Sequence, residues 1–203
     1  KYKISININK KKIYFYSNSF FENDLKNLLA TISIISIFTD IHKLDKNIFY
    51  KHKITNGRGD IIKVKLFKKN FYLMDESYNS NPLSLKSALK NFDMIKVDSA
   101  KKHLILGDML ELGKYSKKLH IEIGKSINKT SLKNVNVIGK HVKWIFNNVN
   151  KSKKGIILNK KSQIIDLIKN TLSNNDYLMI KGSNSTGLNS LANQIKTGKI
   201  DAL

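Results

Sequence analysis

The sequence predicts an α/β fold in which a mostly parallel sheet is covered by flanking helices. From Phe71 onward, short apolar runs alternate five times with longer amphipathic segments. Strands that alternate with helical segments are typical of parallel sheets built from strand–helix units. Hydrophobic residues make up 41% of the 203-residue chain, which is enough for a buried core. The expected arrangement is therefore Rossmann-like.

The repeating part of the chain predicts five strands, at residues 71–74, 103–106, 135–138, 155–158 and 177–180. Five helices are expected after them, at residues 82–92, 117–127, 141–149, 162–172 and 188–195. Leu85, Leu89 and Phe92 fall on one face of the first of these helices, as helical periodicity requires.

The residues before Phe71 predict a less regular arrangement. In chain order they favour alternating strands at 4–8 and 13–16, helical stretches at 23–38 and 45–50, a strand at 61–67 and a tight turn at 68–70. The glycines of Asn56-Gly57-Arg58-Gly59 mark a further turn before the last strand.

Polar residues gather where the expected strands end. In open α/β sheets, ligands bind beyond the carboxyl ends of the strands. Those positions are residues 75–81, 107–109, 139–140, 159–160 and 181–185, and three of the five carry more functional groups than a turn requires.

The first of these junctions divides into two parts. Asn81 is a good N-cap and Pro82 suits the first helical position, so both are explained by the start of a helix. Asp75, Glu76 and Asn79 are not explained in that way. Acids at a strand end are suited to holding ribose hydroxyls or a metal ion.

The formal charge of +22 raises the question of a nucleic-acid partner. Arg58 is the only arginine, and the lysines are scattered over every segment. Specific readers of bases and phosphates favour arginine for its bidentate fork. We therefore favour a solvated, lysine-biased surface without a nucleic-acid partner, and keep a basic nucleic-acid-binding α/β module as an alternative.

Other features of the composition bear on the compartment. The absence of cysteine fits a reducing compartment. The longest apolar run, residues 28–38, is shorter than the roughly 20 residues that a membrane helix needs. No secretion signal follows Lys1, and the histidines lack metal-ligand spacing. We expect a cytoplasmic protein without membrane insertion or a metal site, and the missing initial methionine suggests a fragment.

The segment after the first repeating strand resembles a known signature. Residues 75–89, DESYNSNPLSLKSAL, are similar to the D-D-S-Y-N-A-N-P-x-S-M-x-A-A-L motif in the C-terminal domain of Mur ligases. Four further segments fall in the family's order and resemble its P-G-R, G-D-M-x-E-L-G, V-G-K and V-K-G-S-R-S motifs: Asn56–Gly59, Leu106–Gly113, Val137–Lys140 and Met179–Ser183.

The resemblance implies a three-domain, ATP-dependent ligase of peptidoglycan synthesis, hence of cell shape and division. Residues 1–69 would be the end of its central α/β ATP-binding domain, and residues 70–203 its C-terminal domain. The signature is that of the branch that adds D-alanyl-D-alanine to UDP-N-acetylmuramoyl-tripeptide through an acyl phosphate. ATP and Mg²⁺ are implied, with the metal ligands outside this chain, and so is a monomeric state.

Matching positions suggest roles for single residues. By the resemblance, Arg58, Glu76, Asn79 and Asn81 would contact the nucleotide. Asp108, Lys181 and Ser183 would contribute to the dipeptide's surroundings or to the closing interface. No catalytic residue is assigned. His120 falls where the family has a histidine, and we expect a structural hydrogen bond from it.

The chain also departs from the family's pattern. Glu76 replaces an aspartate, and Asn184 stands in place of an arginine. No G-x-x-x-x-G-K-[ST] phosphate loop occurs, so we expect the chain alone to be inactive. A degenerate, non-catalytic ligase relative is a second alternative. A folylpolyglutamate synthetase relative is disfavoured by the S-Y-N-x-N-P form of residues 77–82.

Overall fold

The computed structural model describes residues 1–8, 10–51 and 56–200, which divide into two compact units. The units are Lys1–Ile54 and Thr55–Leu203. The division lies earlier than the boundary predicted between residues 69 and 70. The reason is that β3 (Asp60–Leu66) pairs with β4 (Lys69–Glu76) and so belongs to the sheet of the second unit.

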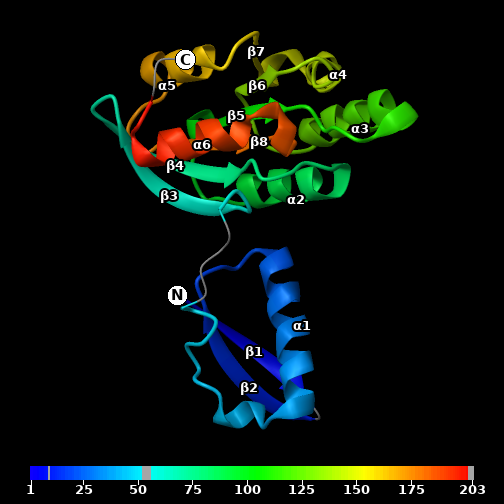
Figure 1. Cartoon of the computed structure of the whole chain (residues 1–203), viewed down its shortest axis with the longest axis vertical. Coiled ribbons are helices and arrows are strands. Elements are labelled where there is room, and N and C mark those ends of the chain that lie inside the picture. Colours follow the sequence, from blue (N-terminus) through cyan, green and yellow to red (C-terminus); the bar gives the residue numbers. More distant parts are fainter. Residues whose placement is uncertain (9, 52–55, 201–203) are drawn as a thin grey trace. The chain divides into compact units, whose positions relative to one another are not determined.

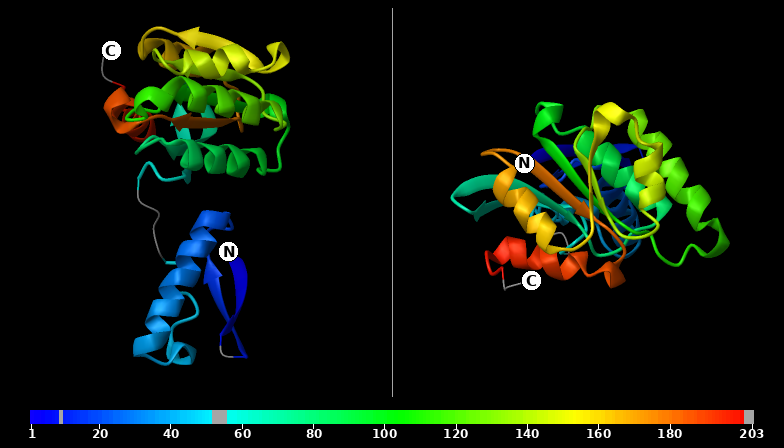
Figure 2. Two further views of the ribbon diagram at one scale, coloured as in Figure 1. Left: turned by 90° about the vertical axis from the view of Figure 1, so that its right-hand side faces the viewer. Right: turned by 90° about the horizontal axis from the view of Figure 1, so that it is seen from above.

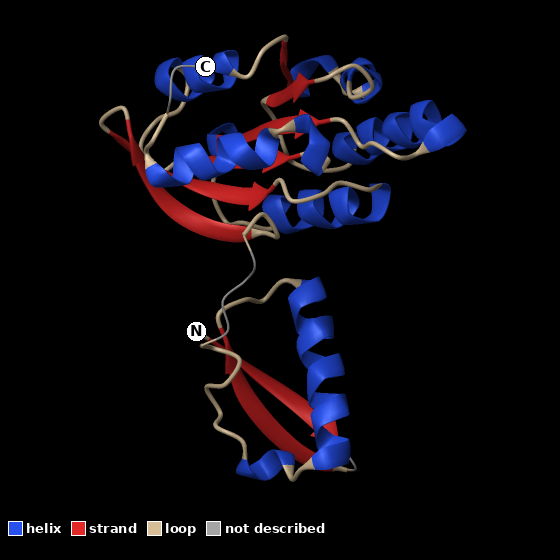
Figure 3. Cartoon of the chain, viewed as in Figure 1, coloured by secondary structure: helices blue, strands red, loops and turns tan. Residues whose placement is uncertain are grey.

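The first unit packs a hairpin against one long helix. Its elements are β1 (Tyr2–Ile8), β2 (Lys11–Ser17), α1 (Glu22–Phe38) and the 3-10 turn η1 (Ile41–Lys43) (Figure 3). The predicted alternation is confirmed, because Ile13 and Phe15 of β2 point into a small core with Leu28 and Ile32 of α1. The helical stretch predicted at 45–50 is wrong. The Asp45 side chain accepts a hydrogen bond from the Asn47 amide at 2.9 Å, which starts turns instead.

The second unit is a six-stranded sheet covered by helices (Figure 1). The five predicted strands are confirmed as β4, β5 (Lys102–Gly107), β6 (Val135–Ile138), β7 (Lys154–Leu158) and β8 (Tyr177–Lys181). The five predicted helices are α2 (Pro82–Asp93), α3 (Ser116–Asn128), α4 (Lys143–Asn148), α5 (Ser162–Asn170) and α6 (Leu188–Thr197). Short 3-10 turns are η2 (Ser99–Lys101), η3 (Gly113–Tyr115), η4 (Lys151–Lys153) and η5 (Asn184–Thr186).

The strand order is β3-β4-β8-β5-β6-β7, with β3 antiparallel and the other strands parallel. Parallel connections are right-handed, so their direction along the sheet decides which face a helix covers. The chain advances from β4 to β7 with α2, α3 and α4 on one face. It then returns to insert β8 between β4 and β5, which puts α5 and α6 on the other face (Figure 2).

The core follows from this layering. Every residue of the central strand β5 is buried, as expected for a strand covered on both faces. On the face of α5 and α6, Ile164, Ile168, Leu191 and Ile195 pack against the strands. Among the described residues, no helix combines the length and the apolarity needed to cross a bilayer.

Helix α2 begins as the sequence predicts. The Asn81 side chain accepts from the Ser84 amide at 2.8 Å, and the Ser84 hydroxyl accepts from the Asn81 amide at 3.1 Å. Together they form a capping box in front of Pro82. Leu85 and Phe92 of the predicted apolar face are buried.

Three lysines cap the carboxyl ends of helices at the amino edge of the sheet. Lys69 donates to carbonyls at the end of α5, Lys102 to the last carbonyl of α2 and Lys153 to carbonyls that follow α3, at 2.5 to 3.1 Å. An ammonium at this end of a helix also complements the helix dipole.

The hairpin turn between β3 and β4 is shorter than the sequence predicted. It consists of Phe67 and Lys68 alone, at φ values of 50° and 59°, and Lys69 and Asn70 already belong to β4. Two-residue hairpins favour such positive values because they match the twist of the strands. Residues other than glycine and asparagine disfavour this conformation.

We expect Lys68→Gly to stabilise the second unit by about 0.5–1 kcal/mol, because glycine adopts the left-handed conformation without strain. Equilibrium denaturation with urea measures this. Lys65→Gly, at an exposed position within β3, is the matched control and should destabilise by a similar amount. A destabilising Lys68→Gly would contradict the explanation.

Candidate functional site

The candidate site lies at the carboxyl edge of the sheet, around the end of β8. The neighbours of β8 are β4 and β5, whose following helices cover the opposite face from α6. The edge at each side of β8 is therefore a topological switch point, where open sheets bind ligands. The insertion of β8 also brings together three predicted junctions that are far apart in sequence, namely those after β4, β5 and β8.

Lys181 and Glu76 are the central charged pair of this edge. The sheet register places them opposite each other, and Lys181 Nζ lies 3.3 Å from Glu76 Oε2. The same ammonium donates to the carbonyls of Glu76 at 3.4 Å and Asn79 at 3.0 Å. Burial lowers the pKa of Lys181, and the Glu76 carboxylate opposes that shift. Lys181 thus fixes the position of residues 75–77, which we call the acidic turn.

Arg58 reaches the same edge from the start of the antiparallel strand β3. Its guanidinium lies over the Tyr78 ring, 4.4 Å from the centroid, and its charge acts against that of Lys181. Gly57 and Gly59 have φ values of 78° and 94°. A Cβ at Gly57 would lie 2.9 Å from the Tyr78 amide, so only glycine allows this close approach. The turn is fixed to the acidic turn by the Gly59 amide, which donates to the Asp75 carbonyl at 2.7 Å.

Asp75 is fully buried and does not face the edge directly. Its Oδ2 lies 2.6 Å from Lys196 Nζ of α6, and the same ammonium is 2.8 Å from Asp60 Oδ2. Burial lowers the pKa of Lys196, but the contacts with the Asp60 and Asp75 carboxylates outweigh it, so the net pKa is raised. Asp60 and Lys196 were not predicted as site residues, because 136 residues separate them and neither belongs to a motif.

Asn79 and Asn81 contribute in different ways. Asn79 is exposed, its carbonyl holds Lys181, and its side chain accepts from the Ser80 amide at 2.7 Å. The Asn81 side-chain oxygen is used in the capping box. A ligand contact from Asn81 would therefore have to come from its amide nitrogen.

Asp108 is an anchor for the loop after β6. Its carboxylate accepts from the Lys140 amide at 3.1 Å and from the Val142 amide at 2.6 Å. Gly139 passes so close that a Cβ there would lie 2.6 Å from an Asp108 oxygen. These contacts are those of a carboxylate that caps the turn after β6. Its predicted place in the dipeptide's surroundings or at the closing interface stays a prediction.

Ser183 joins the three junctions around β8. Its hydroxyl accepts from the Leu110 amide at 2.9 Å and donates to the Ser80 carbonyl at 3.3 Å. Its own amide donates to the Asp108 carbonyl at 2.9 Å. Ser183 therefore fixes the spacing of the edge through hydrogen bonds that are already made within the chain.

His120 is the structural hydrogen-bonding residue that the sequence predicted. It is fully buried, its Nδ1 is 2.7 Å from the Ser116 carbonyl, and its Nε2 accepts from the Met109 amide at 3.2 Å. These two bonds require the neutral ring with a proton on Nδ1. Burial lowers the pKa of His120, while Ser116 and Asp108 oppose the shift.

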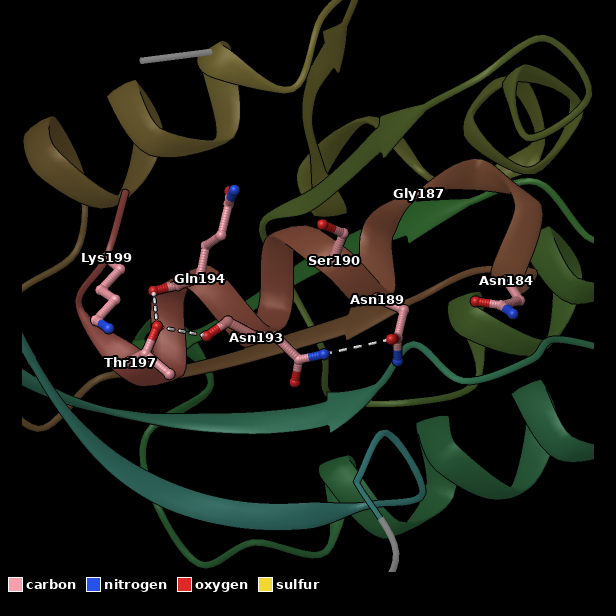
Figure 4. A pocket seen from close by; sticks show the side chains of 8 residues that line it. All are labelled: Asn184, Gly187, Asn189, Ser190, Asn193, Gln194, Thr197 and Lys199. Carbon is pink, nitrogen blue, oxygen red and sulfur yellow. Dashed lines mark hydrogen bonds between the residues drawn. The ribbon is translucent and has the colours of Figure 1, made fainter. Parts of the chain in front are cut away.

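A polar groove of about 550 Å³ runs along the outer side of α6 (Figure 4). Its side chains are Asn184, Asn189, Ser190, Asn193, Gln194, Thr197 and Lys199, with Gly187 between them. At one end, Asn189 donates to the Ser77 hydroxyl at 3.3 Å, so the groove meets the acidic turn. Asn184 lies at this end, where the family pattern has an arginine.

The edge can bind a polyanion that carries hydroxyl groups. Arg58 and Lys181 supply positive charge, and the Glu76 carboxylate can accept from hydroxyls. Within the described residues, no group of three or more acids or histidines is placed to hold a metal ion.

Acidification should destabilise the second unit, because buried His120 and His103 both have lowered pKa values. Burial is the main cause in each case, and the folded chain then binds fewer protons than the unfolded chain below about pH 6.5. The free energy of unfolding should fall with pH by at most about 1.4 kcal/mol per pH unit for each histidine.

His120→Gln should be less stable at pH 8 and should show a shallower loss between pH 7 and pH 5. Urea denaturation at several pH values measures both effects. His42→Gln, an exposed histidine of the first unit, is the control. An unchanged slope in His120→Gln would contradict the assignment.

Comparison with known proteins places this geometry in a family. The model of the family "Mur ligase, glutamate ligase domain" matches residues 57–184, which include all seven predicted site residues. The UDP-N-acetylmuramoyl-tripeptide–D-alanyl-D-alanine ligase of Rickettsia prowazekii is 31% identical over 139 residues, covering 68% of this chain and 29% of the relative. The ligase of the same name from a Buchnera aphidicola strain is 31% identical over 169 residues, covering 82% of this chain and 34% of the relative.

Solved structures share the fold at lower identity. MurF ligase from Thermotoga maritima, solved in complex with ADP, has a TM-score of 0.77 at 16% identity and covers 97% of this chain and 43% of its own. MurF from Acinetobacter baumannii has a TM-score of 0.78 at 18% identity and covers 96% of this chain and 42% of its own. The chain spans about a third of the length of the curated relatives it matches. By the match over residues 57–184, the chain belongs to the Mur ligase family.

Proposed function

We propose that this chain is part of an ATP-dependent ligase that joins D-alanyl-D-alanine to UDP-N-acetylmuramoyl-tripeptide. It would contain the domain that closes over the bound nucleotide. The observation that carries the proposal is the match to relatives of that name, one of them 31% identical over 82% of the chain. The residues that gather around β8 fall within the family match. Residues 1–54 would then be the end of the central domain, and residues 55–203 the C-terminal domain.

The reaction needs charge to be positioned more than it needs a nucleophile from the protein. ATP, when bound, supplies the phosphoryl group that turns the terminal carboxylate of the tripeptide into an acyl phosphate. The amine of D-alanyl-D-alanine attacks the carbonyl carbon, and phosphate leaves from the tetrahedral intermediate. Cations that are fixed before the reaction lower the cost of the charge that builds up on the oxygens.

The residues at the edge fit a nucleotide. Arg58 is exposed and is held in place by the Tyr78 ring, so its planar guanidinium can donate to phosphate or ribose oxygens. Glu76 lies beside it and can accept from a ribose hydroxyl. Lys181, below Glu76, adds positive charge without reaching solvent, because its side chain is 1% exposed.

The glutamate at position 76 is compatible with such a role. Its extra methylene, relative to the aspartate of the family pattern, is taken up by the contact of its Oε2 with Lys181. A Cβ at Gly59 would lie 2.9 Å from Glu76 Oε1. The carboxylate therefore also packs closely on residues 57–59, which we call the arginine turn. This geometry favours a retained acidic group over a degenerate site.

Mg²⁺ would be held together with ATP by residues outside this chain, as the resemblance implies. An enzyme that uses ATP and a UDP-linked precursor would act in the cytoplasm. It would act there as a monomer in cell-wall synthesis.

Arg58→Ala should weaken binding of ADP to the 203-residue chain by about 10-fold to 100-fold, the value of one charge-assisted hydrogen bond. Arg58→Lys should lie between, because it keeps the charge but loses the planar fork. Isothermal titration calorimetry measures the affinity. Lys65→Ala, exposed on the same strand, is the control. Equal affinities for Arg58→Ala and the parent would contradict the nucleotide role.

The chain alone should not turn over substrate, because it contains no G-x-x-x-x-G-K-[ST] loop for the ATP phosphates. A phosphate-release assay with UDP-N-acetylmuramoyl-tripeptide, ATP, Mg²⁺ and D-alanyl-D-alanine measures this. The control is the complete Bacillus subtilis ligase of the same name. Appreciable turnover by the 203 residues would refute the division of labour between domains.

A further inference from the structure

One ammonium of the last helix lies between two carboxylates of the first hairpin of the sheet. Lys196 Nζ is 2.6 Å from Asp75 Oδ2 and 2.8 Å from Asp60 Oδ2. Asp75 is fully buried, and the side chains of Lys196 and Asp60 are only 10% and 16% exposed. The three groups come from α6, β4 and β3. Lys196 and Asp60 are not among the predicted site residues, and Asp75 is the first residue of the predicted junction at 75–81.

The remaining oxygens of the two carboxylates hold the two turns that carry the nucleotide-binding candidates. Asp60 Oδ1 accepts from the Gly57 amide at 3.2 Å, next to Arg58. Asp75 Oδ1 accepts from the amide and the hydroxyl of Ser77 at 3.0 and 2.5 Å, next to Glu76. Each carboxylate is thus bound on one side by Lys196 and on the other side by a turn.

The charge balance gives Lys196 its importance. Two carboxylates that share one cation would repel each other without it, and in a buried site they cannot both stay ionised at low cost. Lys181 of β8 is the other ammonium whose charge interacts with Asp75, but its own contacts are to Glu76 and Asn79. Lys196 is therefore the cation that keeps the β3 and β4 carboxylates at a fixed spacing.

We propose that Lys196 is a positioning residue of the nucleotide site: it sets the spacing between the arginine turn, residues 57–59, and the acidic turn, residues 75–77. The last helix then controls how Arg58 and Glu76 face a ligand, through the Asp60 and Asp75 carboxylates that Lys196 contacts. That the ligand is a nucleotide rests on the proposed function. The link between the two turns rests on the contacts of Lys196 described above. Asn189 of the same helix also contacts the acidic turn, because its side chain donates a hydrogen bond to the Ser77 hydroxyl.

The test uses the 203-residue chain and compares Lys196→Met, the double variant Lys196→Met with Asp60→Asn, and Lys125→Met. Lys125 is an exposed lysine of α3 and serves as the matched control. Hydrogen exchange of the Gly57 and Ser77 amides reports on the two turns without any ligand. Calorimetric titration with ADP reports on binding.

Lys196→Met should speed exchange of both amides at least about 10-fold, while the amides of the central strand β5 exchange as in the control. ADP binding should weaken about 10-fold. Asp60→Asn in the double variant removes one of the repelling charges and should restore slow exchange and affinity. Loss of packing alone would not produce this rescue.

The proposal is overturned if Lys196→Met matches Lys125→Met in exchange and affinity, or if the double variant shows no rescue. If Lys196→Met does not fold, a cooperative unfolding transition in the double variant supports the charge balance, and its absence counts against it. A parent chain that binds no ADP contradicts the proposed function instead, and the exchange data then decide the positioning of the turns.

Discussion

The return of the chain from β7 to β8 is the constraint on which the second unit depends. A parallel crossover is right-handed, so a chain that reverses its direction along the sheet must also change the face that its helices cover. The return places β8 between β4 and β5 and gives the sheet two covered faces. It also brings the ends of three strands together at one edge. The site is therefore a consequence of topology before it is a consequence of any single residue.

Much of the polar chemistry at this edge is used to hold the edge itself. Asp108 fixes one loop, Ser183 joins three junctions, and His120 holds the Met109 amide. Buried polar groups of this kind cost free energy unless they are paired, and here they are paired with backbone groups of loops that no helix or strand satisfies. What faces outward is a small set, Arg58 with its aromatic support and Glu76 above Lys181.

The sequence predicted the elements well because each strand and helix of the second unit has its own apolar period. It could not predict the strand order, since nothing in residues 177–181 says that this strand enters between two earlier ones. The two compact units divide before the predicted domain boundary, because β3 pairs with β4 in the antiparallel direction and lacks a helix of its own. Among the site residues, Arg58 and Glu76 were found through motifs. Lys196 was not, because its role comes from two partners on other strands and its type is the commonest charge in the chain.

The lysines that cap α2, α3 and α5 change how the charge of +22 should be understood. Part of that charge belongs to lysines that donate hydrogen bonds to backbone carbonyls, at the edge of the sheet opposite the site. Reagents that acylate amines would therefore act unevenly on this protein. Exposed lysines would lose their charge at little cost, whereas Lys102, whose pKa is lowered by burial, would react only when α2 and β5 open. Its labelling would thus follow the opening of the fold and would say nothing about ligand binding.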